Sequence, residues 1–293
     1  MHSGQGIERN TGQRVGREKI YTRFGSPLYA ISMSSIPCAC TIAGSDSGGG
    51  AGIQADLKTF SAIGVWGTTV ISAITAQNSR GVLGVTLVPE EMVALQLDAV
   101  LDDFDIRAFK TGMLGTAGII RAVDRHLPPR CPLVVDPVMV ATSGSRLLDP
   151  GAEQELIVTL LSRATVVTPN IPEAVVLSGM SISSTSDMRE AALRIMEFGP
   201  EYVVIKGGHL EGDEVTDLLV GPSSELCLTS PRYPHQVHGS GCCFSAAITA
   251  YMALGYTVPG AFRKAKEFID LAIRDAVVSR SGMYSVNPHR EKE

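Results

Sequence analysis

The chain has 293 residues, of which 25 are basic and 30 acidic, so its formal net charge is −5. Hydrophobic residues make up 44% and charged residues 19%, a balance that supports a sizeable core and excludes an intrinsically disordered chain. The sequence contains only seven lysines and no basic run with interleaved aromatics, which argues against a nucleic-acid-binding face.

Hydropathy and cysteine usage restrict the class further. No apolar run reaches the roughly 18 residues that a membrane helix needs, because Asp136 interrupts the most apolar stretch, residues 133–141. The six cysteines are too few for a disulfide scaffold, and none has the CxxC spacing of a zinc ribbon. We therefore expect a protein without a membrane span, with reduced thiols, in the cytoplasm.

The first 35 residues differ in composition from the rest of the chain. Gly, Ser, Asn and Arg dominate up to Arg23, and an uncharged stretch follows over residues 24–45. A signal peptide is disfavoured because Pro27 and several serines interrupt any apolar core, while acidic residues dilute the basic segment. We expect a disordered extension over residues 1–35, one folded domain over 36–288 and a short tail over 289–293. Whether Met1 or Met33 is the true start stays open.

From Cys38 onward, short β-branched runs alternate with segments of helical period, which predicts an α/β fold: a doubly wound, mostly parallel sheet with helices on both faces. The predicted strands lie at residues 40–43, 70–74, 133–135, 166–168 and 202–205. Helical spacing of apolar residues predicts helices at 53–64, 93–104, 188–198 and 261–272. The last three strands show no polar alternation, as expected when helices cover both faces of a sheet.

Polar and glycine-rich segments follow the predicted strands. In sheets of this kind the ligand binds beyond the carboxyl ends of the strands, where these segments would gather. They are the turn at 44–52, Gln77 with Asn78, Asp136, Asn170 with Glu173, and the run from Lys206 to His209. We expect the functional site along this edge.

The glycine-rich turn at 44–52 precedes a predicted helix, so its N–H groups could bind an anion or a polar ligand. Gly50, Gly52 and Ala55 satisfy a relaxed dinucleotide fingerprint, but no acidic residue follows about 20 positions later, which argues against a nicotinamide enzyme. No Gly-Lys pair occurs anywhere in the chain, which excludes a P-loop.

The segment HGSGC, residues 238–242, directly precedes an Ala-rich run that predicts a helix from Ser245. Small residues at a helix start leave N–H groups free to face a transferring phosphoryl group, and the helix dipole adds positive potential. The same field should lower the pKa of Cys242, whose thiolate could then accept a proton from a substrate hydroxyl. A buried structural cysteine is the alternative, and His238 could equally serve as a hydrogen-bonding group of the loop.

Four further polar residues have both a chemical and a structural interpretation. Asn170 and Glu173 could offer an amide and a carboxylate to Mg²⁺, but a polar residue followed by Glu three positions later is also an ordinary helix cap. Asp136 follows a fully apolar strand, where an unpaired carboxylate is costly unless it meets a cation. Lys206 could reach a nucleotide phosphate or pair with a nearby carboxylate.

Seven segments in order carry a family resemblance: AGSDSGGGAGIQADLKT (43–59), AQNSRGV (76–82), KTGML (110–114), VVDPVMV (134–140), TPNIPEA (168–174), IKGGH (205–209) and HGSGC (238–242). Together they resemble the hydroxymethylpyrimidine kinase and phosphomethylpyrimidine kinase family of thiamine synthesis, a branch of the ribokinase superfamily. The resemblance covers residues 39–288, and the combination is far more specific than any single motif.

The resemblance implies a doubly wound fold, ATP with Mg²⁺, and two successive phosphorylations. The first acts on the hydroxymethyl group of 4-amino-5-hydroxymethyl-2-methylpyrimidine and the second on the resulting phosphate. The positions that it implies around the pyrimidine are Gly44, Ala51, Asp56, Gln77, Met113 and Val138. It implies a metal and phosphate region of Asp136, Asn170 and Glu173, nucleotide-phosphate contacts at Lys206, Gly207 and Gly208, and an anion hole of Gly239, Ser240, Gly241 and Cys242.

Many sugar kinases of the superfamily have an Asp base where this chain has Cys242. We hypothesise that a thiol can serve the first, hydroxyl-phosphorylating step, whereas a permanent carboxylate would repel the anionic phosphate that is the nucleophile of the second. Two departures from the family pattern occur. Thr142 stands where a loop lysine is usual, and Ser240 replaces a Thr while keeping the hydroxyl.

Two alternative functions stay open. A pyridoxal or pyridoxine kinase is the nearest, but some enzymes of that kind use a second cysteine in the loop after the VMV strand, and no cysteine lies between Pro137 and Pro150. A catalytically silent pyrimidine-binding regulator is the other, and the presence of Asp136, Glu173, Lys206 and Cys242 argues against it. The resemblance also implies a small-molecule partner and a possible homodimer, with no nucleic-acid or membrane partner.

Overall fold

The computed structural model describes residues 20–21, 27–28, 36–78, 80–139, 147–149 and 151–289. The chain divides into two units, Met1–Ser35 and Ile36–Glu293. In the first, β1 (Ile20–Tyr21) pairs antiparallel with β2 (Pro27–Leu28). The predicted extension over 1–35, its alternative start at Met33 and the departure at Thr142 lie wholly or largely outside the described residues.

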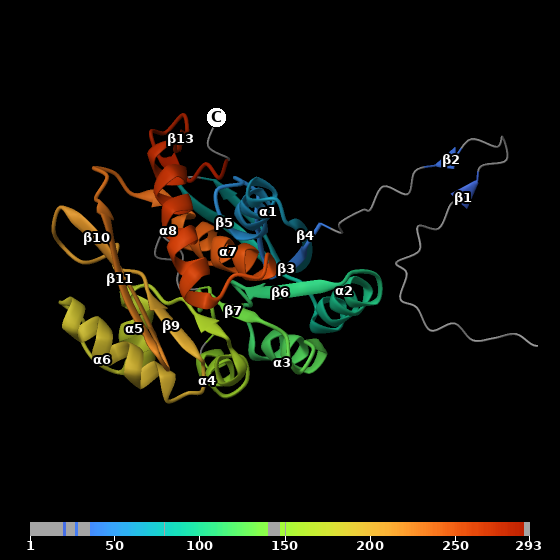
Figure 1. Cartoon of the computed structure of the whole chain (residues 1–293), viewed down its shortest axis with the longest axis horizontal. Helices are drawn as coiled ribbons and strands as arrows, with labels where there is room; N and C mark the ends of the chain where they lie inside the picture. The colour runs from blue at the N-terminus through green and yellow to red at the C-terminus, as the bar shows by residue number, and fades with distance from the viewer. Residues whose placement is uncertain are drawn as a thin grey trace, which may run out of the picture. The chain divides into compact units, whose positions relative to one another are not determined.

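Within the described part of the second unit, one sheet has the strand order β11-β10-β9-β8-β7-β6-β3-β4-β5 (Figure 1). The strands are β3 (Cys38–Asp46), β4 (Trp66–Asn78), β5 (Gly81–Leu87), β6 (Ile106–Thr111), β7 (Leu133–Val135), β8 (Val166–Val167), β9 (Tyr202–Ile205), β10 (Glu214–Gly221) and β11 (Ser224–Pro231). The six neighbouring strands β9, β8, β7, β6, β3 and β4 pair in parallel. Strand β5 at one edge, and β10 with β11 at the other, pair antiparallel.

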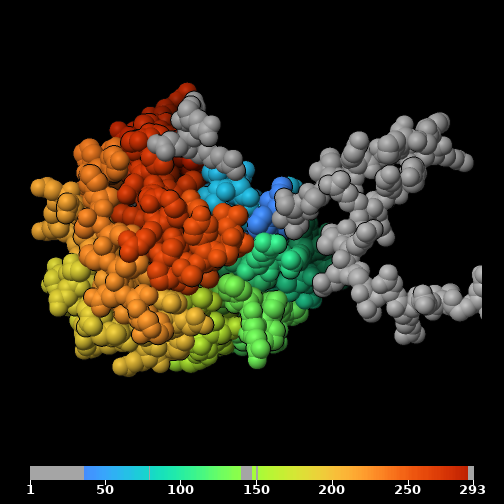
Figure 2. Space-filling view, in the orientation of Figure 1, coloured from blue at the N-terminus to red at the C-terminus, as the bar shows by residue number. Residues whose placement is uncertain are grey.

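Helices cover both faces of this sheet (Figure 1). One face carries α1 (Gly52–Ile63), α7 (Ser240–Ala253) and α8 (Val258–Arg274). The other carries α2 (Glu90–Asp103), α3 (Ala117–His126), α4 (Ala152–Val158), the 3₁₀ turn η1 (Leu161–Arg163), α5 (Ile171–Ser178) and α6 (Thr185–Met196). In the space-filling view, orange and red atoms of the C-terminal third cover the centre of the face with α7 and α8 (Figure 2).

Neighbouring residues of the central strands enter different cores. Val134 and Val166 pack in the cluster with α7 and α8, whereas Val135 and Val167 pack in the cluster on the opposite face. Side chains of a strand alternate between faces, so a strand buried on both sides needs an unbroken apolar run. This confirms the predicted doubly wound α/β fold.

A small sheet joins the C-terminal segment to the HGSGC motif. β12 (Val237–His238) pairs parallel with β14 (Tyr284–Ser285), which pairs antiparallel with β13 (Val277–Val278). The backbone of His238 is thereby fixed before α7 begins.

The structure corrects several predicted boundaries. α7 begins at Ser240, five residues before the predicted start, because the helix includes the small residues of the motif. β4 extends well beyond the predicted 70–74 at both ends. Among the described residues, no helix combines the length and apolar character that a bilayer-spanning segment requires.

Candidate active site

The carboxyl ends of the strands bring the predicted segments together. Lys206 follows β9 and its Nζ lies 2.8 Å from Oδ1 of Asp136, which follows β7. Asn170 forms an isolated parallel bridge with Lys206. A Cβ on Gly241, in the first turn of α7, would lie 3.3 Å from Lys206 Nζ. The anion-hole motif, the acidic residues and the lysine therefore occupy one region, as predicted.

Asp136 is 2% exposed, and both of its carboxylate oxygens have polar partners. Besides the contact with Lys206, its Oδ1 accepts a hydrogen bond from Thr168 Oγ1 at 3.3 Å, and its Oδ2 accepts one from Ser245 Oγ at 3.0 Å. Burial disfavours the charged form of Lys206, but the charges of Asp136 and Glu173 raise its pKa overall. The prediction that Asp136 must meet a cation is confirmed.

Asn170 and Glu173 form a capping box at the start of α5. Asn170 Oδ1 accepts from the Glu173 N–H, and Glu173 Oε2 accepts from the Asn170 N–H, both at 2.9 Å. The structural interpretation of this pair is therefore confirmed. Burial raises the pKa of Glu173 to about 7, and the charge of Asp136 adds to the rise while Lys206 opposes it.

The donor set fits a divalent cation. Two buried carboxyl groups, those of Asp136 and Glu173, lie near a single ammonium group, that of Lys206. Carboxylate oxygens suit Mg²⁺, which commonly uses one or two of them and completes its shell with water and substrate phosphates. Among the described residues, no three His, Cys, Asp or Glu side chains gather as a metal site.

The HGSGC motif forms a sharp turn followed by a helix start. Gly239 is the N-cap residue of α7 with φ of 81°, and a Cβ there would lie 1.7 Å from the carbonyl oxygen of Gly50. No side chain of the described residues caps the helix, so its first N–H groups are free for an anion. That these N–H groups bind a phosphoryl group stays a prediction.

The predicted low pKa of Cys242 is wrong. Burial raises the pKa of the Cys242 thiol to about 11, and the charges of Asp136 and Asp56 raise it further. Lys110 and a hydrogen bond from the Gly52 N–H act in the opposite direction but do not compensate. The thiol is therefore neutral at neutral pH, because the loss of water and the two carboxylates outweigh the effects of Lys110 and of the Gly52 N–H.

The residues expected around a pyrimidine lie at two depths. A Cβ on Gly44 would lie 3.1 Å from Met113 Sδ, so these two residues adjoin each other, and the Ala51 N–H donates to Asp46 Oδ2 at 2.8 Å. Val138 lies two residues after Asp136, and its N–H donates to the Asp136 carbonyl at 2.8 Å.

Asp56 lies deeper than those positions, at 0% exposure. Its Oδ2 accepts from Lys110 Nζ at 2.9 Å and from Thr41 Oγ1 at 2.6 Å. Its role towards a substrate stays a prediction. The KTGML segment contributed to the family resemblance, but nothing in the sequence indicated that its Lys110 pairs with a carboxylate.

Gln77 lies near the end of β4 beside the HGSGC motif. Its Nε2 lies 3.3 Å from His238 Nε2, and its Oε1 lies 3.3 Å from Thr75 Oγ1. Its backbone N–H donates to Ser47 Oγ at 2.8 Å, which connects it to the glycine-rich turn. Gln77 is therefore positioned by contacts from three segments.

The glycines after Lys206 are held by residues that sequence reasoning missed. The Gly207 N–H donates to Asp217 Oδ1 at 2.9 Å, and Asp217 Oδ2 accepts from Lys266 Nζ at 2.9 Å. The Arg232 guanidinium donates to the carbonyl of Gly208 at 2.9 Å and also bonds the Leu210 carbonyl. No motif marked these residues, since the β10–β11 hairpin that carries Asp217 escaped prediction.

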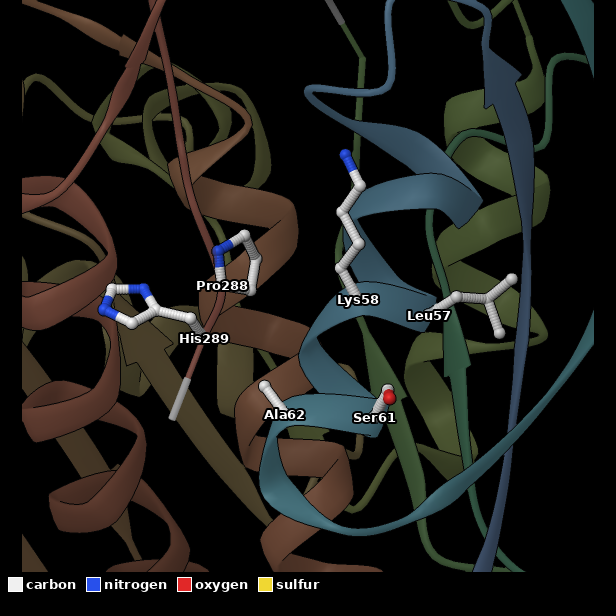
Figure 3. Close-up of a pocket in the computed structure, with 6 residues that line it drawn as sticks. All are labelled: Leu57, Lys58, Ser61, Ala62, Pro288 and His289. Carbon is white, nitrogen blue, oxygen red and sulfur yellow. The ribbon is translucent and has the colours of Figure 1, made fainter. Parts of the chain in front are cut away.

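A shallow open pocket of about 490 Å³ lies elsewhere, between the outer side of α1 and the C-terminal segment (Figure 3). Figure 3 shows Leu57, Lys58, Ser61 and Ala62 on α1 opposite Pro288 and His289. None of the predicted site residues lines it, so it carries no functional argument.

The fold, and the meeting of an uncapped helix start with a lysine and two carboxyl groups, are those of a kinase of the ribokinase-like class. A solved phosphomethylpyrimidine kinase from Clostridium difficile is 44% identical and has a TM-score of 0.72, covering 82% of this chain and 100% of that one. A pyridoxal kinase from Staphylococcus aureus in complex with pyridoxal is 37% identical with a TM-score of 0.80, covering 86% of this chain and 93% of that one.

The sequence comparisons specify the family. A hydroxymethylpyrimidine/phosphomethylpyrimidine kinase of Streptomyces coelicolor is 46% identical over 239 residues, which span 81% of this chain and 88% of that relative. The profile of the family described as phosphomethylpyrimidine kinase matches residues 46–287. The chain belongs to the phosphomethylpyrimidine kinase family.

Proposed function

We propose that this protein uses ATP to phosphorylate the hydroxymethyl group of 4-amino-5-hydroxymethyl-2-methylpyrimidine and then the resulting monophosphate, yielding the diphosphate for thiamine synthesis. The observation that carries the proposal is the meeting of the uncapped start of α7 with Lys206, whose Nζ would lie 3.3 Å from a Cβ on Gly241. Both features stabilise negative charge on a transferring phosphoryl group.

Each group of the site has a proposed role. The N–H groups of Gly239, Ser240, Gly241 and Cys242 would bind the transferring phosphoryl oxygens. Lys206, with the Gly207 and Gly208 backbone, would contact the nucleotide phosphates. Gly44, Ala51, Asp56, Gln77, Met113 and Val138 would surround the pyrimidine.

Asp136 and Glu173 would hold Mg²⁺, with Asn170 fixing Glu173 through the capping box. The ion would supply positive charge to the phosphates when bound. Lys206 supplies a counter-charge to Asp136, at a Nζ–Oδ1 distance of 2.8 Å. Lys206 can therefore exchange its carboxylate partner for a phosphate when the nucleotide binds.

Cys242 would act in the first step, where a hydroxyl must lose its proton. Because the thiol is neutral in the free protein, proton transfer requires that bound substrate and nucleotide alter its surroundings. In the second step the nucleophile is already a phosphate oxygen, and a neutral thiol beside it adds no repulsion.

The oligomeric state that we propose is a homodimer formed through β5 and α2. Edge strand β5 exposes Leu83 at 81%, Val85 at 45% and Leu87 at 38%, and α2 exposes Met92 and Leu95 nearby in the chain. An apolar unpaired edge strand favours association with another chain. Light scattering on the wild type and on Leu83→Glu tests this, since the variant should shift the mass towards the monomer.

We also propose that the protein is located in the cytoplasm, as the sequence predicts. Fractionation of cells tests this location.

Turnover by the purified protein tests the proposed function directly. With Mg²⁺ and ATP, the protein should convert the hydroxymethylpyrimidine and its monophosphate, with products identified by mass, and Asp136→Asn should abolish both activities. Turnover of pyridoxal alone would move the function to vitamin B6 salvage. No turnover of any of the three compounds would leave the pyrimidine-binding regulator as the remaining interpretation.

A further inference from the structure

His238 lies between the glycine-rich turn and Gln77 and has no role in the site described so far. Its backbone is fixed by β12, and its ring packs on Gly50, where a Cβ would lie 2.7 Å from His238 Cδ2. One ring nitrogen, Nε2, lies 3.1 Å from Asp46 Oδ2 and 3.3 Å from the carboxamide of Gln77. This nitrogen has to satisfy two neighbours with opposite requirements.

Asp46 is built to remain charged. Its Oδ1 accepts from the Gly48 N–H at 2.8 Å, and its Oδ2 accepts from the N–H groups of Gly50 and Ala51 at 3.1 and 2.8 Å. Burial opposes ionisation, but the hydrogen bonds from His238 and from the Ala51 and Gly48 N–H groups lower the pKa of Asp46 overall. A carboxylate is an acceptor only, so His238 Nε2 must carry the proton.

The proton on Nε2 decides the orientation of Gln77. A protonated ring nitrogen cannot accept a hydrogen bond from an NH₂ group, so the amide oxygen of Gln77 must be the atom that faces His238. The two ends of a carboxamide are nearly isosteric and exchange by a half-turn, so the network decides between them. The NH₂ group then faces Thr75 Oγ1, which donates its own proton to the Ser45 carbonyl at 2.8 Å and is free to accept. In this arrangement the single N–H of His238 Nε2 is shared between two acceptors, Asp46 Oδ2 and the Gln77 oxygen, and one carboxamide N–H faces Thr75 Oγ1. The second carboxamide N–H is left for a ligand.

We infer that His238, held by Asp46, is a positioning residue that fixes the Gln77 carboxamide with its oxygen towards the imidazole, and thereby sets which aromatic edge the site accepts. The inference rests on the proposed function in taking Gln77 to contact the pyrimidine. A fixed carboxamide offers one acceptor and one donor in a defined order. An amino group beside a ring nitrogen matches that order in one orientation, whereas the ring of pyridoxal carries no such pair.

The first experiment examines the free protein and needs no substrate. ¹⁵N chemical shifts of the histidine side chains report which ring nitrogen carries a proton, and comparison with His238→Met assigns the His238 signal among the six histidines. A proton on Nε2 at neutral pH, lost or weakened in Asp46→Asn, supports the inference. An unprotonated Nε2 would overturn it even if the proposed substrate proved wrong.

The second experiment measures what the orientation does. His238→Met fills the same space without an N–H, whereas His238→Gln retains an N–H that can reach Asp46. The KM for the 4-amino substrate should rise about tenfold in His238→Met, as expected for a lost hydrogen bond worth about 1.4 kcal/mol, and recover in His238→Gln. The KM values for ATP and for the analogue lacking the 4-amino group should stay within about twofold.

A double-mutant cycle with Gln77 distinguishes positioning from general loss of structure. If His238 acts through Gln77, His238→Met should cause no further loss of selectivity in a Gln77→Ala background. Additive losses, or an equal rise in KM for the two pyrimidines, would overturn the inference. Wild-type turnover of the 4-amino substrate is measured in the same series, so failure of the proposed function shows separately from failure of this inference.

Discussion

Lys110 and Asp56 form an ion pair with an Nζ–Oδ2 distance of 2.9 Å, and neither side chain is exposed to solvent. Lys110 comes from β6 and Asp56 from α1, so the pair links the sheet to a covering helix. Burial disfavours the charged form of Lys110, but Asp56, Cys242 and Asp136 together raise its pKa. Asp56 therefore keeps Lys110 charged in the interior, near Cys242.

Removing one partner of this pair should be far more costly than removing both. Lys110→Met leaves an uncompensated carboxylate in the interior and should lower the free energy of unfolding by about 3–5 kcal/mol, measured by urea denaturation. Lys110→Met combined with Asp56→Leu should recover most of that loss. Arg189→Met is the control, because the Arg189–Glu225 pair is about half exposed and should contribute under about 1 kcal/mol. If Lys110→Met and Arg189→Met lowered the free energy of unfolding by the same amount, this account would be contradicted.

The raised pKa of Cys242 predicts how its alkylation depends on pH. Because the pKa is raised from 9.0 to about 11, the rate of modification by iodoacetamide should keep rising above pH 9, whereas an ordinary thiol levels off there. The folded thiol also holds its proton more tightly than the unfolded one. Its contribution to stability is therefore complete below pH 9 and is lost as the pH rises towards 11.

Peptide mapping by mass spectrometry follows Cys242 separately from the other five cysteines. The same protein in urea is the control, where Cys242 should level off near pH 9. A folded protein whose Cys242 modification levels off at or below pH 8 would show that the thiol is activated in the free enzyme, as the sequence first suggested.

Replacing Cys242 with Asp separates the two proposed phosphorylation steps. A permanent carboxylate can accept the hydroxyl proton in the first step but repels the phosphate nucleophile in the second. Cys242→Asp should therefore reduce kcat/KM for the monophosphate about tenfold more than for the hydroxymethylpyrimidine. Single-turnover assays with each compound measure the two steps, and Cys242→Asn provides a neutral control of similar shape. Equal losses in both steps would sink the charge argument.

Gly239 should not tolerate a side chain, because its φ is positive and because the Gly50 carbonyl lies close to it. Gly255 has a positive φ without a close neighbour, so it serves to separate the two effects. Both Gly239 and Gly255 have positive φ, at 81° and 91°, but a Cβ on Gly239 would lie 1.7 Å from the Gly50 carbonyl oxygen while one on Gly255 meets nothing within 4 Å. Gly255→Ala should cost about 1 kcal/mol of stability through backbone strain alone. Gly239→Ala should cost more and reduce kcat at least about tenfold, because the turn must move away from Gly50. Matching thermal melts and activities for the two variants would refute the close approach.

The sequence predicted the interior of the fold better than its edges. β7 and β9 have the predicted bounds, because strands covered on both faces must be continuously apolar. β6 was not predicted, because Arg107 and Lys110 break its apolar run, and Lys110 is buried only through its tertiary partner Asp56. Edge strands β10 and β11 also escaped, since local sequence does not specify antiparallel pairing at a sheet edge.

The order of the motifs predicted the site residues, but their pKa values and mutual contacts could be seen only in the structure. Family resemblance indicated Asp136, Lys206 and the HGSGC segment, which the structure brings together. The pKa of Cys242 depends on burial and on Asp56 and Asp136, which lie far from it in the sequence. Likewise, the contact of His238 with Asp46 joins residues 192 positions apart, and no local pattern indicates it.

A competition experiment tests the central claim most directly. Purified protein with Mg²⁺ and limiting ATP is offered equal amounts of the hydroxymethylpyrimidine and pyridoxal, and ³¹P NMR follows the products over time. We expect the pyrimidine monophosphate to appear first and the diphosphate to replace it, with pyridoxal phosphate forming last if it forms at all. Pyridoxal phosphate appearing first, with no diphosphate at any time, would contradict the assignment of a two-step pyrimidine kinase.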